Sequence, residues 1–216
     1  MKATRNLIIV NVVIFIATML NQEFMMSQFA LFYPASRFFR WWQPLTHMFM
    51  HGGIWHIFFN MFSLWMFGSV IERYVGPRKF LALFLVAGLG GAALHLGVEW
   101  IQAGVYENAM AEGSQSALAS YVSLCNTPTV GASGAIYGLL IAYAMLFPDA
   151  TMMLLFPPIP MKAKWMVTIF AAVELFTGVT SIASGIAHFA HLGGMLFGWL
   201  MIRRWRRRGT LFDNRW

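Results

Sequence analysis

The sequence predicts an all-α polytopic membrane protein, a six-transmembrane-helix bundle, and three observations lead to that prediction. Hydrophobic residues make up 59% of the 216 residues and charged residues only 11%, whereas about 25% of an ordinary soluble domain is charged. The mean hydropathy is +0.63. The apolar residues gather in stretches of membrane-spanning length, with Lys and Arg between them. A soluble chain of this size could not bury so much apolar surface, so lipid must serve as part of its solvent.

Six apolar stretches are expected to cross the bilayer, at residues 5–24, 54–72, 80–102, 130–147, 164–182 and 186–203. The first stretch is the weakest candidate, because its strongly apolar part extends only from Leu7 to Leu20. Behind Lys2 and Arg5 it could pass for a signal peptide. No small-x-small cleavage site follows it, so we expect a retained helix.

The distribution of Lys and Arg predicts the orientation. If the amino terminus is cytoplasmic, the cytoplasmic segments hold 13 of the 15 Lys and Arg residues, and only Arg37 and Arg40 stay outside. This bias favours six spans with both termini cytoplasmic. A basic run directly after the last apolar stretch is more typical of membrane orientation than of nucleic-acid binding. We therefore expect one membrane domain at residues 1–203 and a basic cytoplasmic tail at residues 204–216.

Two longer loops are expected outside, at about residues 25–53 and 103–129. The first contains Arg37-Phe38-Phe39-Arg40-Trp41-Trp42, a mixture of cations and aromatic rings that is typical of an interfacial element. The second contains Cys125, the only cysteine. The sequence therefore predicts neither an intramolecular disulfide nor a thiolate metal site.

Lipid penalises buried polar groups, so polar residues inside the expected spans are candidate functional residues. The first set, Gly131-Ala132-Ser133-Gly134, opens the fourth span. We expect Ser133 about five residues inside, roughly 7 Å deep. The free N–H groups of this first helical turn stabilise developing negative charge. The structural alternative is a packing helix of small residues, because Gly134 and Gly138 form a G-x-x-x-G pattern.

The second set opens the sixth span, where His191, Gly194 and Gly198 share one narrow helical face. We expect His191 at the same depth as Ser133. Two glycine-lined helices can approach very closely, and their packing would carry Ser133 and His191 towards hydrogen-bonding distance. An imidazole beside a hydroxyl is the minimal activated nucleophile. The alternative is a packed histidine that only forms structural hydrogen bonds.

The third set is His56 and Asn60, which share one face of the second span at i, i+4 spacing. Their side chains could donate hydrogen bonds to the oxyanion of a tetrahedral intermediate, or serve only as hydrogen-bonding partners between helices. No carboxylate is expected near enough for a triad, since Glu72 and Glu99 lie near span ends and Glu174 lies in the middle of the fifth span. The sequence therefore predicts a Ser–His dyad.

Two further groups of residues accompany these sets. Tyr137 lies one turn after Ser133 on the same face, where it could pack against the imidazole. His47, His51 and His56 could in principle coordinate zinc, but neither an H-E-x-x-H pattern nor an acidic partner accompanies them. We expect these histidines to tie the first outside loop to the second span through hydrogen bonds, and we predict no metal and no cofactor.

Together these residues resemble the rhomboid family, from about Trp41 to Gly198. Gly131-Ala132-Ser133-Gly134 is similar to the family's G-x-S-G, and His191-x-x-Gly194-x-x-x-Gly198 to its H-x-x-G-x-x-x-G, which selects His191 over His188 as the base. His56-x-x-x-Asn60 resembles the oxyanion motif, Tyr137 the tyrosine that stacks on the catalytic histidine, and Glu72-Arg73-x-x-Gly76 a structural motif. One departure is Gln43 after Trp42, where the family often has Trp-Arg.

The resemblance implies an intramembrane serine endopeptidase that cleaves transmembrane proteins in or near the bilayer. Its nucleophile would be Ser133 and its general base His191, with His56 and Asn60 at the oxyanion. The implied partners are transmembrane protein substrates and the lipid bilayer, with no nucleic acid, and the sequence does not indicate an oligomeric state. The expected location is the cell membrane, as in a bacterial inner membrane, with the site opening to the external face.

Two other functions are alternatives to a protease. One is a non-catalytic rhomboid-like protein that binds membrane clients, but such relatives typically lose the serine or the histidine, and both are present here. The other is a small transporter or proton channel. That function needs polar groups across the bilayer, whereas the polar groups expected here gather at one depth near the outer face.

Overall fold

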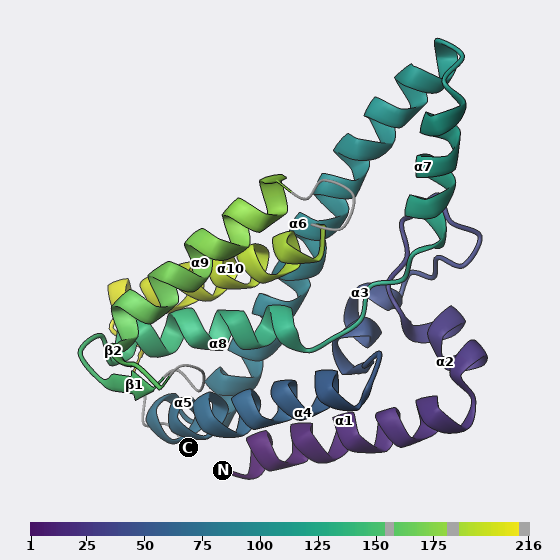
Figure 1. The fold of residues 1–216 in the computed structure, drawn as a ribbon. Helices are drawn as coiled ribbons and strands as arrows, with labels where there is room; N and C mark the ends of the chain where they lie inside the picture. Colours follow the sequence, from purple (N-terminus) through teal and green to yellow (C-terminus); the bar gives the residue numbers. More distant parts are fainter. Residues whose placement is uncertain (154–157, 181–185, 212–216) are drawn as a thin grey trace.

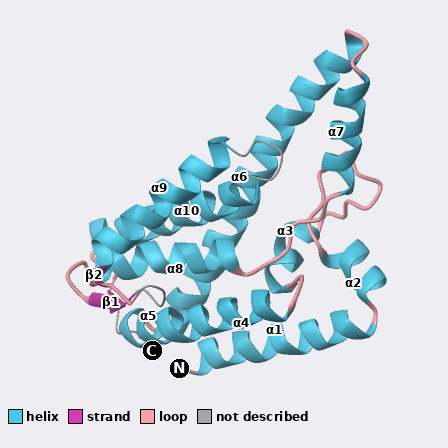
Figure 2. Ribbon diagram, in the orientation of Figure 1, coloured by secondary structure: helices cyan, strands magenta, loops and turns pink. Residues whose placement is uncertain are grey.

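The computed structural model describes residues 1–153, 158–180 and 186–211, and most of this chain is helical (Figures 1 and 2). The α-helices are α1 (Lys2–Leu20), α2 (Gln22–Phe29), α3 (Gln43–Thr46), α4 (Ile54–Ser63), α5 (Ser69–Val75), α6 (Pro77–Ala111), α7 (Gln115–Asn126), α8 (Ser133–Leu146), α9 (Ala163–Thr180) and α10 (Ile186–Arg207). A 3₁₀ turn, η1 (His47–Phe49), follows α3. A π-helical segment, η2 (Leu64–Gly68), joins α4 to α5. Strands β1 (Thr151–Met153) and β2 (Pro160–Lys162) form a small antiparallel pair in which Thr151 lies opposite Lys162.

The expected spans correspond to helices, but several ends differ. Helix α6 is longer than residues 80–102, and its outer turns pack against α7 in a helical hairpin that projects at the top right of Figure 1. Helix α8 begins at Ser133, because Gly131 has a φ of +131°, which is not helical. The last two residues of the expected fifth span, and residues 212–216 of the expected tail, lie outside the described residues.

Helix length and composition identify a polytopic membrane protein. Four described helices, at Lys2–Leu20, Ile54–Val75, Pro77–Ala111 and Ala163–Thr180, are long and apolar enough to cross a bilayer. Ser133–Leu146 is a shorter apolar helix. The helical, multi-pass character of the chain is therefore confirmed, while the count of six spans stays a prediction.

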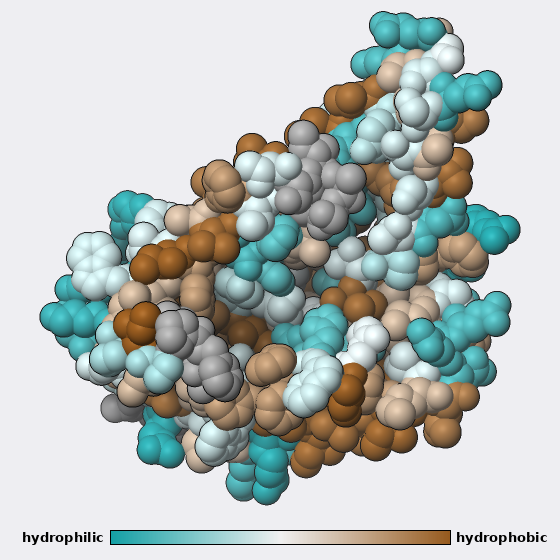
Figure 3. Space-filling view, viewed as in Figure 1, coloured by the Kyte–Doolittle hydropathy of each residue, from teal (hydrophilic) through white to brown (hydrophobic). Residues whose placement is uncertain are grey.

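Large apolar side chains cover the outside of the bundle. Figure 3 shows hydrophobic residues in brown along the lower edge of the molecule, where α1 and α4 lie in Figure 1. Leu20 is 83% exposed and Trp55 is 69% exposed, and on α9 Phe176 is also 69% exposed. Large exposed apolar side chains are unfavourable in water and favourable in lipid.

Glycines allow α6, α8 and α10 to pack with their backbones in contact. A Cβ atom added at Gly194 of α10 would lie 1.9 Å from the Gly134 carbonyl oxygen of α8, and one at Gly198 would lie 2.6 Å from the Gly138 carbonyl oxygen. Farther round α10, a Cβ atom at Gly193 would lie 2.7 Å from a carbonyl oxygen of α6. Such close contact is a main source of helix association in lipid, where apolar burial does not drive helices together.

A carboxylate fastens the first helix to the end of the second span. Glu72, which is 4% exposed, accepts hydrogen bonds from the backbone N–H groups of Ala3 at 3.0 Å and Thr4 at 2.8 Å. It also accepts one from the Thr4 hydroxyl at 2.7 Å. The N–H groups of a first helical turn have no partner inside their own helix, so Glu72 caps α1 from a distant part of the sequence.

The segment between α1 and α4 is organised by Gln43, the residue at which the sequence departs from the rhomboid pattern. Gln43 is fully buried. Its side-chain nitrogen donates to the carbonyl oxygens of Phe38 at 2.8 Å and Ser27 at 3.3 Å, and its side-chain oxygen accepts from the Phe32 N–H at 3.3 Å. A single neutral amide therefore satisfies three backbone groups of this loop.

Candidate active site

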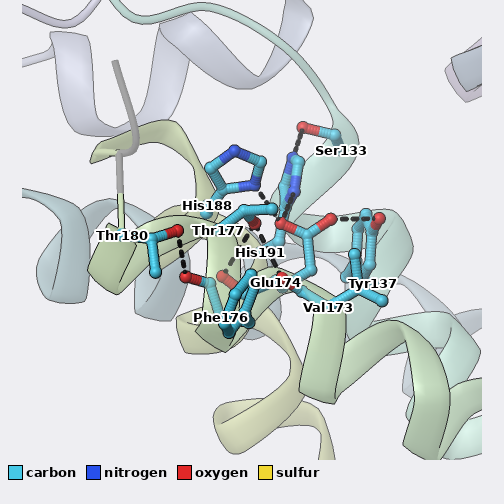
Figure 4. A network of polar contacts seen from close by, with 9 residues as sticks. All are labelled: Ser133, Tyr137, Val173, Glu174, Phe176, Thr177, Thr180, His188 and His191. Atoms are coloured by element: carbon cyan, nitrogen blue, oxygen red, sulfur yellow. Dashed lines mark hydrogen bonds and ion pairs between the residues drawn. The ribbon is translucent and has the colours of Figure 1, made fainter. Parts of the chain in front are cut away.

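The glycine contact between α8 and α10 carries a hydroxyl and an imidazole to the same point. Ser133 is the first residue of α8, and His191 lies five residues after the start of α10. The Ser133 hydroxyl lies 2.8 Å from Nε2 of His191, a hydrogen bond that Figure 4 shows from close by. Ser133 therefore lies in the first turn of its helix, as the sequence predicted, and it meets His191 there.

An aromatic ring fixes the plane of the imidazole. The Tyr137 ring, one turn after Ser133, lies parallel to the His191 ring, with 4.3 Å between the centroids and 9° between the planes. The Tyr137 hydroxyl points away from the imidazole and donates a hydrogen bond of 2.5 Å to Oε1 of Glu174. The tyrosine thus contacts both the histidine and a carboxylate.

The prediction that no carboxylate lies near the Ser–His pair is wrong. Oε2 of Glu174 lies 3.0 Å from Nδ1 of His191 (Figure 4). Nδ1 makes no aligned hydrogen bond, so this is a close polar contact. Glu174 comes from the middle of α9 and is 7% exposed, because α9 turns this side chain inward against α8 and α10. One signal in the sequence could have found it, namely that a carboxylate inside an apolar helix requires polar partners on neighbouring helices.

His188 contacts the same carboxylate and does not contact Ser133. Its Nδ1 donates a hydrogen bond of 2.5 Å to Oε2 of Glu174. Glu174, His188 and His191 are also the one group of described residues whose donor atoms lie close enough together to be considered for a metal ion. Two ligands of a tetrahedral zinc ion lie about 3.4 Å apart, given bonds of about 2.1 Å. The shorter contacts here fit hydrogen bonding better than coordination.

On the other side of Ser133, His56 faces the backbone of Gly131. A Cβ atom at Gly131 would lie 2.8 Å from Nε2 of His56, and Gly131 itself is held by a hydrogen bond of 2.9 Å from its N–H to the His47 carbonyl oxygen. The Gly52 N–H donates to Nδ1 of His56 at 3.4 Å. The proton of a neutral ring then lies on Nε2, which makes this nitrogen a donor directed at the space beside Ser133.

Two further donors lie at the same place. Asn60 is buried, and its side-chain nitrogen donates one hydrogen to the His56 carbonyl oxygen at 2.9 Å. An amide nitrogen carries two hydrogens, so a second remains for another acceptor. The N–H of Ser133 has no partner within its helix, because it is the first residue of α8.

The Ser–His pair opens into a cavity of about 460 Å³. The polar side chains of His56, Asn60, Ser133 and His191 line it, together with apolar ones that include Trp55 and Phe170. This volume lies within the range of sites that bind small ligands. The cavity therefore has room for a short extended peptide segment beside the hydroxyl.

Two histidines that precede α4, His47 and His51, are buried beside the site. Nδ1 of His47 lies 3.1 Å from the Gln43 carbonyl oxygen, and the His51 ring lies edge-on to His56 with 5.0 Å between the centroids. Burial lowers the pKa of both His47 and His51 to about 4, so both are neutral at pH 7. Of the three histidines predicted to tie this segment to the second span, His56 does so, because it accepts the hydrogen bond from the Gly52 N–H. The described hydrogen bond of the His47 ring stays within its own segment.

Fold and site together define a multi-pass helical membrane protein with a hydroxyl–imidazole pair at a cavity. The sequence model of the Rhomboid domain matches residues 38–208. The chain belongs to the rhomboid family, as the sequence predicted. Members of this family act on membrane protein substrates within the bilayer.

Individual relatives come from mitochondria and from bacteria. RHOMBOID-like protein 12, mitochondrial, of Arabidopsis thaliana is 32% identical over 208 residues, which cover 94% of this chain and 59% of that protein. Rhomboid protein 1, mitochondrial, of Saccharomyces cerevisiae is 27% identical, covering 78% of this chain and 45% of that protein. Rhomboid protease AarA of Providencia stuartii is 28% identical, covering 74% and 54%.

This chain therefore spans about half the length of these relatives. Because several relatives are named as mitochondrial proteins, the comparisons do not support the predicted bacterial inner membrane. The apolar helices indicate a membrane protein without specifying which membrane.

Proposed function

We propose that this chain is an intramembrane serine endopeptidase that cleaves transmembrane proteins with a Ser133 nucleophile and a His191 base. The observation that carries this proposal is the hydrogen bond of 2.8 Å between the Ser133 hydroxyl and Nε2 of His191. Its place at a cavity in a rhomboid bundle supports the proposal further.

The chemistry follows from this geometry. His191 Nε2 takes the proton of the Ser133 hydroxyl as Oγ bonds to the substrate carbonyl carbon. His56 Nε2–H, the Asn60 amide and the Ser133 N–H donate hydrogen bonds to the oxyanion. His191 then gives its proton to the leaving amine as the C–N bond breaks. Water, activated by the same imidazole, hydrolyses the acyl-enzyme.

The substrate must present an extended segment to this site. The hydrogen bonds of a transmembrane helix shield its carbonyl groups, so a substrate helix must unwind locally before it is cut. We therefore propose that substrates carry helix-breaking residues near the membrane face at which the cavity opens. The charge distribution supports cytoplasmic termini and a site open to the opposite face.

Replacing the nucleophile tests this function. The Ser133→Ala protein, reconstituted in liposomes with a model transmembrane substrate, should cleave only at background rate and should no longer react with a fluorophosphonate probe. Ser116→Ala, on the exposed part of α7, is the control and should behave like the wild type. Full cleavage by the Ser133→Ala protein would exclude the proposed mechanism. A wild-type protein that binds the substrate but neither cleaves it nor reacts with the probe would instead be a client-binding relative.

A further inference from the structure

One carboxylate faces the centre of the bundle from α9, at a point where its neighbours in the sequence are exposed. The neighbours of Glu174 on α9 are exposed, with Val173 at 53%, Leu175 at 52% and Phe176 at 69%, whereas Glu174 is 7% exposed. A charged side chain in the middle of a membrane helix is unfavourable unless polar groups surround it. Such a residue persists where polar partners compensate it, and it is by default a candidate for function.

The partners of Glu174 come from two other helices and engage both of its oxygens. The Tyr137 hydroxyl on α8 donates to Oε1 at 2.5 Å, and His188 Nδ1 on α10 donates to Oε2 at 2.5 Å. His191 Nδ1 lies 3.0 Å from the same Oε2. The carboxylate is therefore held in place by two hydrogen bonds and lies against the nitrogen of His191 that faces away from Ser133 (Figure 4).

This position determines which nitrogen of His191 carries the proton. Nε2 can accept the proton of the Ser133 hydroxyl only if the proton of the neutral ring is on Nδ1. Nδ1 is buried and makes no aligned hydrogen bond within the described residues, and the carboxylate of Glu174 is the acceptor 3.0 Å away. A carboxylate at this point favours the Nδ1–H tautomer and stabilises the imidazolium that forms in the reaction.

We infer that Glu174 is a positioning residue that acts through His191, so that the site is a Ser133–His191–Glu174 triad rather than a dyad. The inference rests on the proposed protease function. During the reaction the proton moves from Ser133 Oγ to His191 Nε2 and on to the leaving amine, while the Nδ1 proton stays on the ring and Glu174 stays ionised. Contacts of this kind are often poorly aligned before substrate binds, which accounts for the unaligned 3.0 Å contact.

His188 supports the carboxylate in this arrangement. Its ring stands at 87° to the His191 ring, with 6.3 Å between the centroids, and it shares Oε2 with His191. Removal of His188 leaves Glu174 with the Tyr137 hydroxyl and His191. We therefore assign His188 to holding Glu174 and not to proton transfer with Ser133.

The test compares two substitutions of Glu174 with a matched control. Glu174→Gln keeps the size of the side chain and can still accept from Tyr137, but it removes the charge. We expect kcat to fall by about 10² to 10³-fold with little change in KM, and the rate of reaction with a fluorophosphonate probe to fall in parallel. Glu174→Asp restores the charge and should recover at least about tenfold of the lost rate, since the tautomer preference returns.

Glu99→Gln is the control, because Glu99 is another buried carboxylate beside a histidine, 3.4 Å from His95 on the same helix. It should leave kcat unchanged.

The outcomes separate this inference from the proposed function. If Ser133→Ala is inactive but Glu174→Gln turns over like the wild type, the triad is excluded and the dyad protease stands. If Glu174→Gln and Glu174→Asp lose activity equally and both melt early, the role of Glu174 is structural and the inference fails. If Ser133→Ala retains activity, the protease function itself fails. A selective fall in kcat for Glu174→Gln, with rescue in Glu174→Asp, supports the triad.

Discussion

Replacing Gly194 by alanine should separate α8 from α10 and disable the Ser133–His191 pair. The added Cβ atom would lie 1.9 Å from the Gly134 carbonyl oxygen, and real Cβ contacts essentially never fall below 3.0 Å. The two backbones must therefore move apart by about 1 Å. His191, three residues before Gly194, moves with α10, so its hydrogen bond to Ser133 would lengthen from 2.8 Å to about 4 Å, beyond hydrogen-bonding distance. A displacement of this size costs about 10²-fold in rate, or about 2.7 kcal/mol.

The assay is cleavage of a transmembrane substrate in liposomes, with thermal unfolding of each variant measured beside it. Gly97→Ala is the control, since a Cβ atom at this position on α6 would meet nothing within 4 Å. It should keep wild-type activity and should be as stable or more stable by up to about 1 kcal/mol, because alanine favours the helix. Gly198→Ala, whose Cβ atom would lie 2.6 Å from the Gly138 carbonyl oxygen, should lose less activity than Gly194→Ala.

Wild-type turnover by a folded Gly194→Ala protein would refute the argument that backbone contact sets the Ser133–His191 distance. If Gly194→Ala does not fold, the milder Gly198→Ala variant carries the test. In that case, equal activities of Gly198→Ala and Gly97→Ala would refute the proposed role of backbone contact.

Two further predictions concern residues around the site. His188→Ala should lower kcat by less than about tenfold, whereas His191→Ala should abolish cleavage, because His191 is the histidine that hydrogen-bonds the Ser133 hydroxyl. The opposite order in the same liposome assay would reassign the base. Gln43→Ala should destabilise the protein by about 2 kcal/mol in thermal or denaturant unfolding, because it leaves three backbone groups without their partner. Gln22→Ala, at an exposed position of α2, should be neutral, and an equally neutral Gln43→Ala would show that water replaces the lost hydrogen bonds.

The sequence was sufficient to predict the helical membrane fold, the rhomboid family and the meeting of Ser133 with His191. Hydropathy identifies the helices because lipid requires long apolar segments. The glycines of the fourth and sixth spans also carry three-dimensional information, since a glycine-lined face has few uses other than close packing against another helix. Hydropathy and glycine spacing are local properties of the sequence, so both can be recognised without a structure.

The position of Glu174 could not be predicted in the same way. Its contact with His191 depends on how α9 is rotated about its axis, and the apolar residues on every side of Glu174 leave that rotation undetermined. The hydrogen bonds of Gln43 pose a similar problem, because their acceptors are backbone groups of an irregular loop. The extension of α6 also depends on tertiary packing, since Ala103 and Tyr106 pack against Leu124 of α7.

The capping of α1 by Glu72 bears on where an autonomous folding unit starts. The donors to this carboxylate belong to residues 3 and 4, which precede the matched region at residues 38–208. A fragment with only the matched region would leave the Glu72 carboxylate without these donors. A buried charge that loses its partners costs about 3 to 5 kcal/mol. The folding unit therefore begins before residue 38, and shortened versions of this protein should keep the first helix.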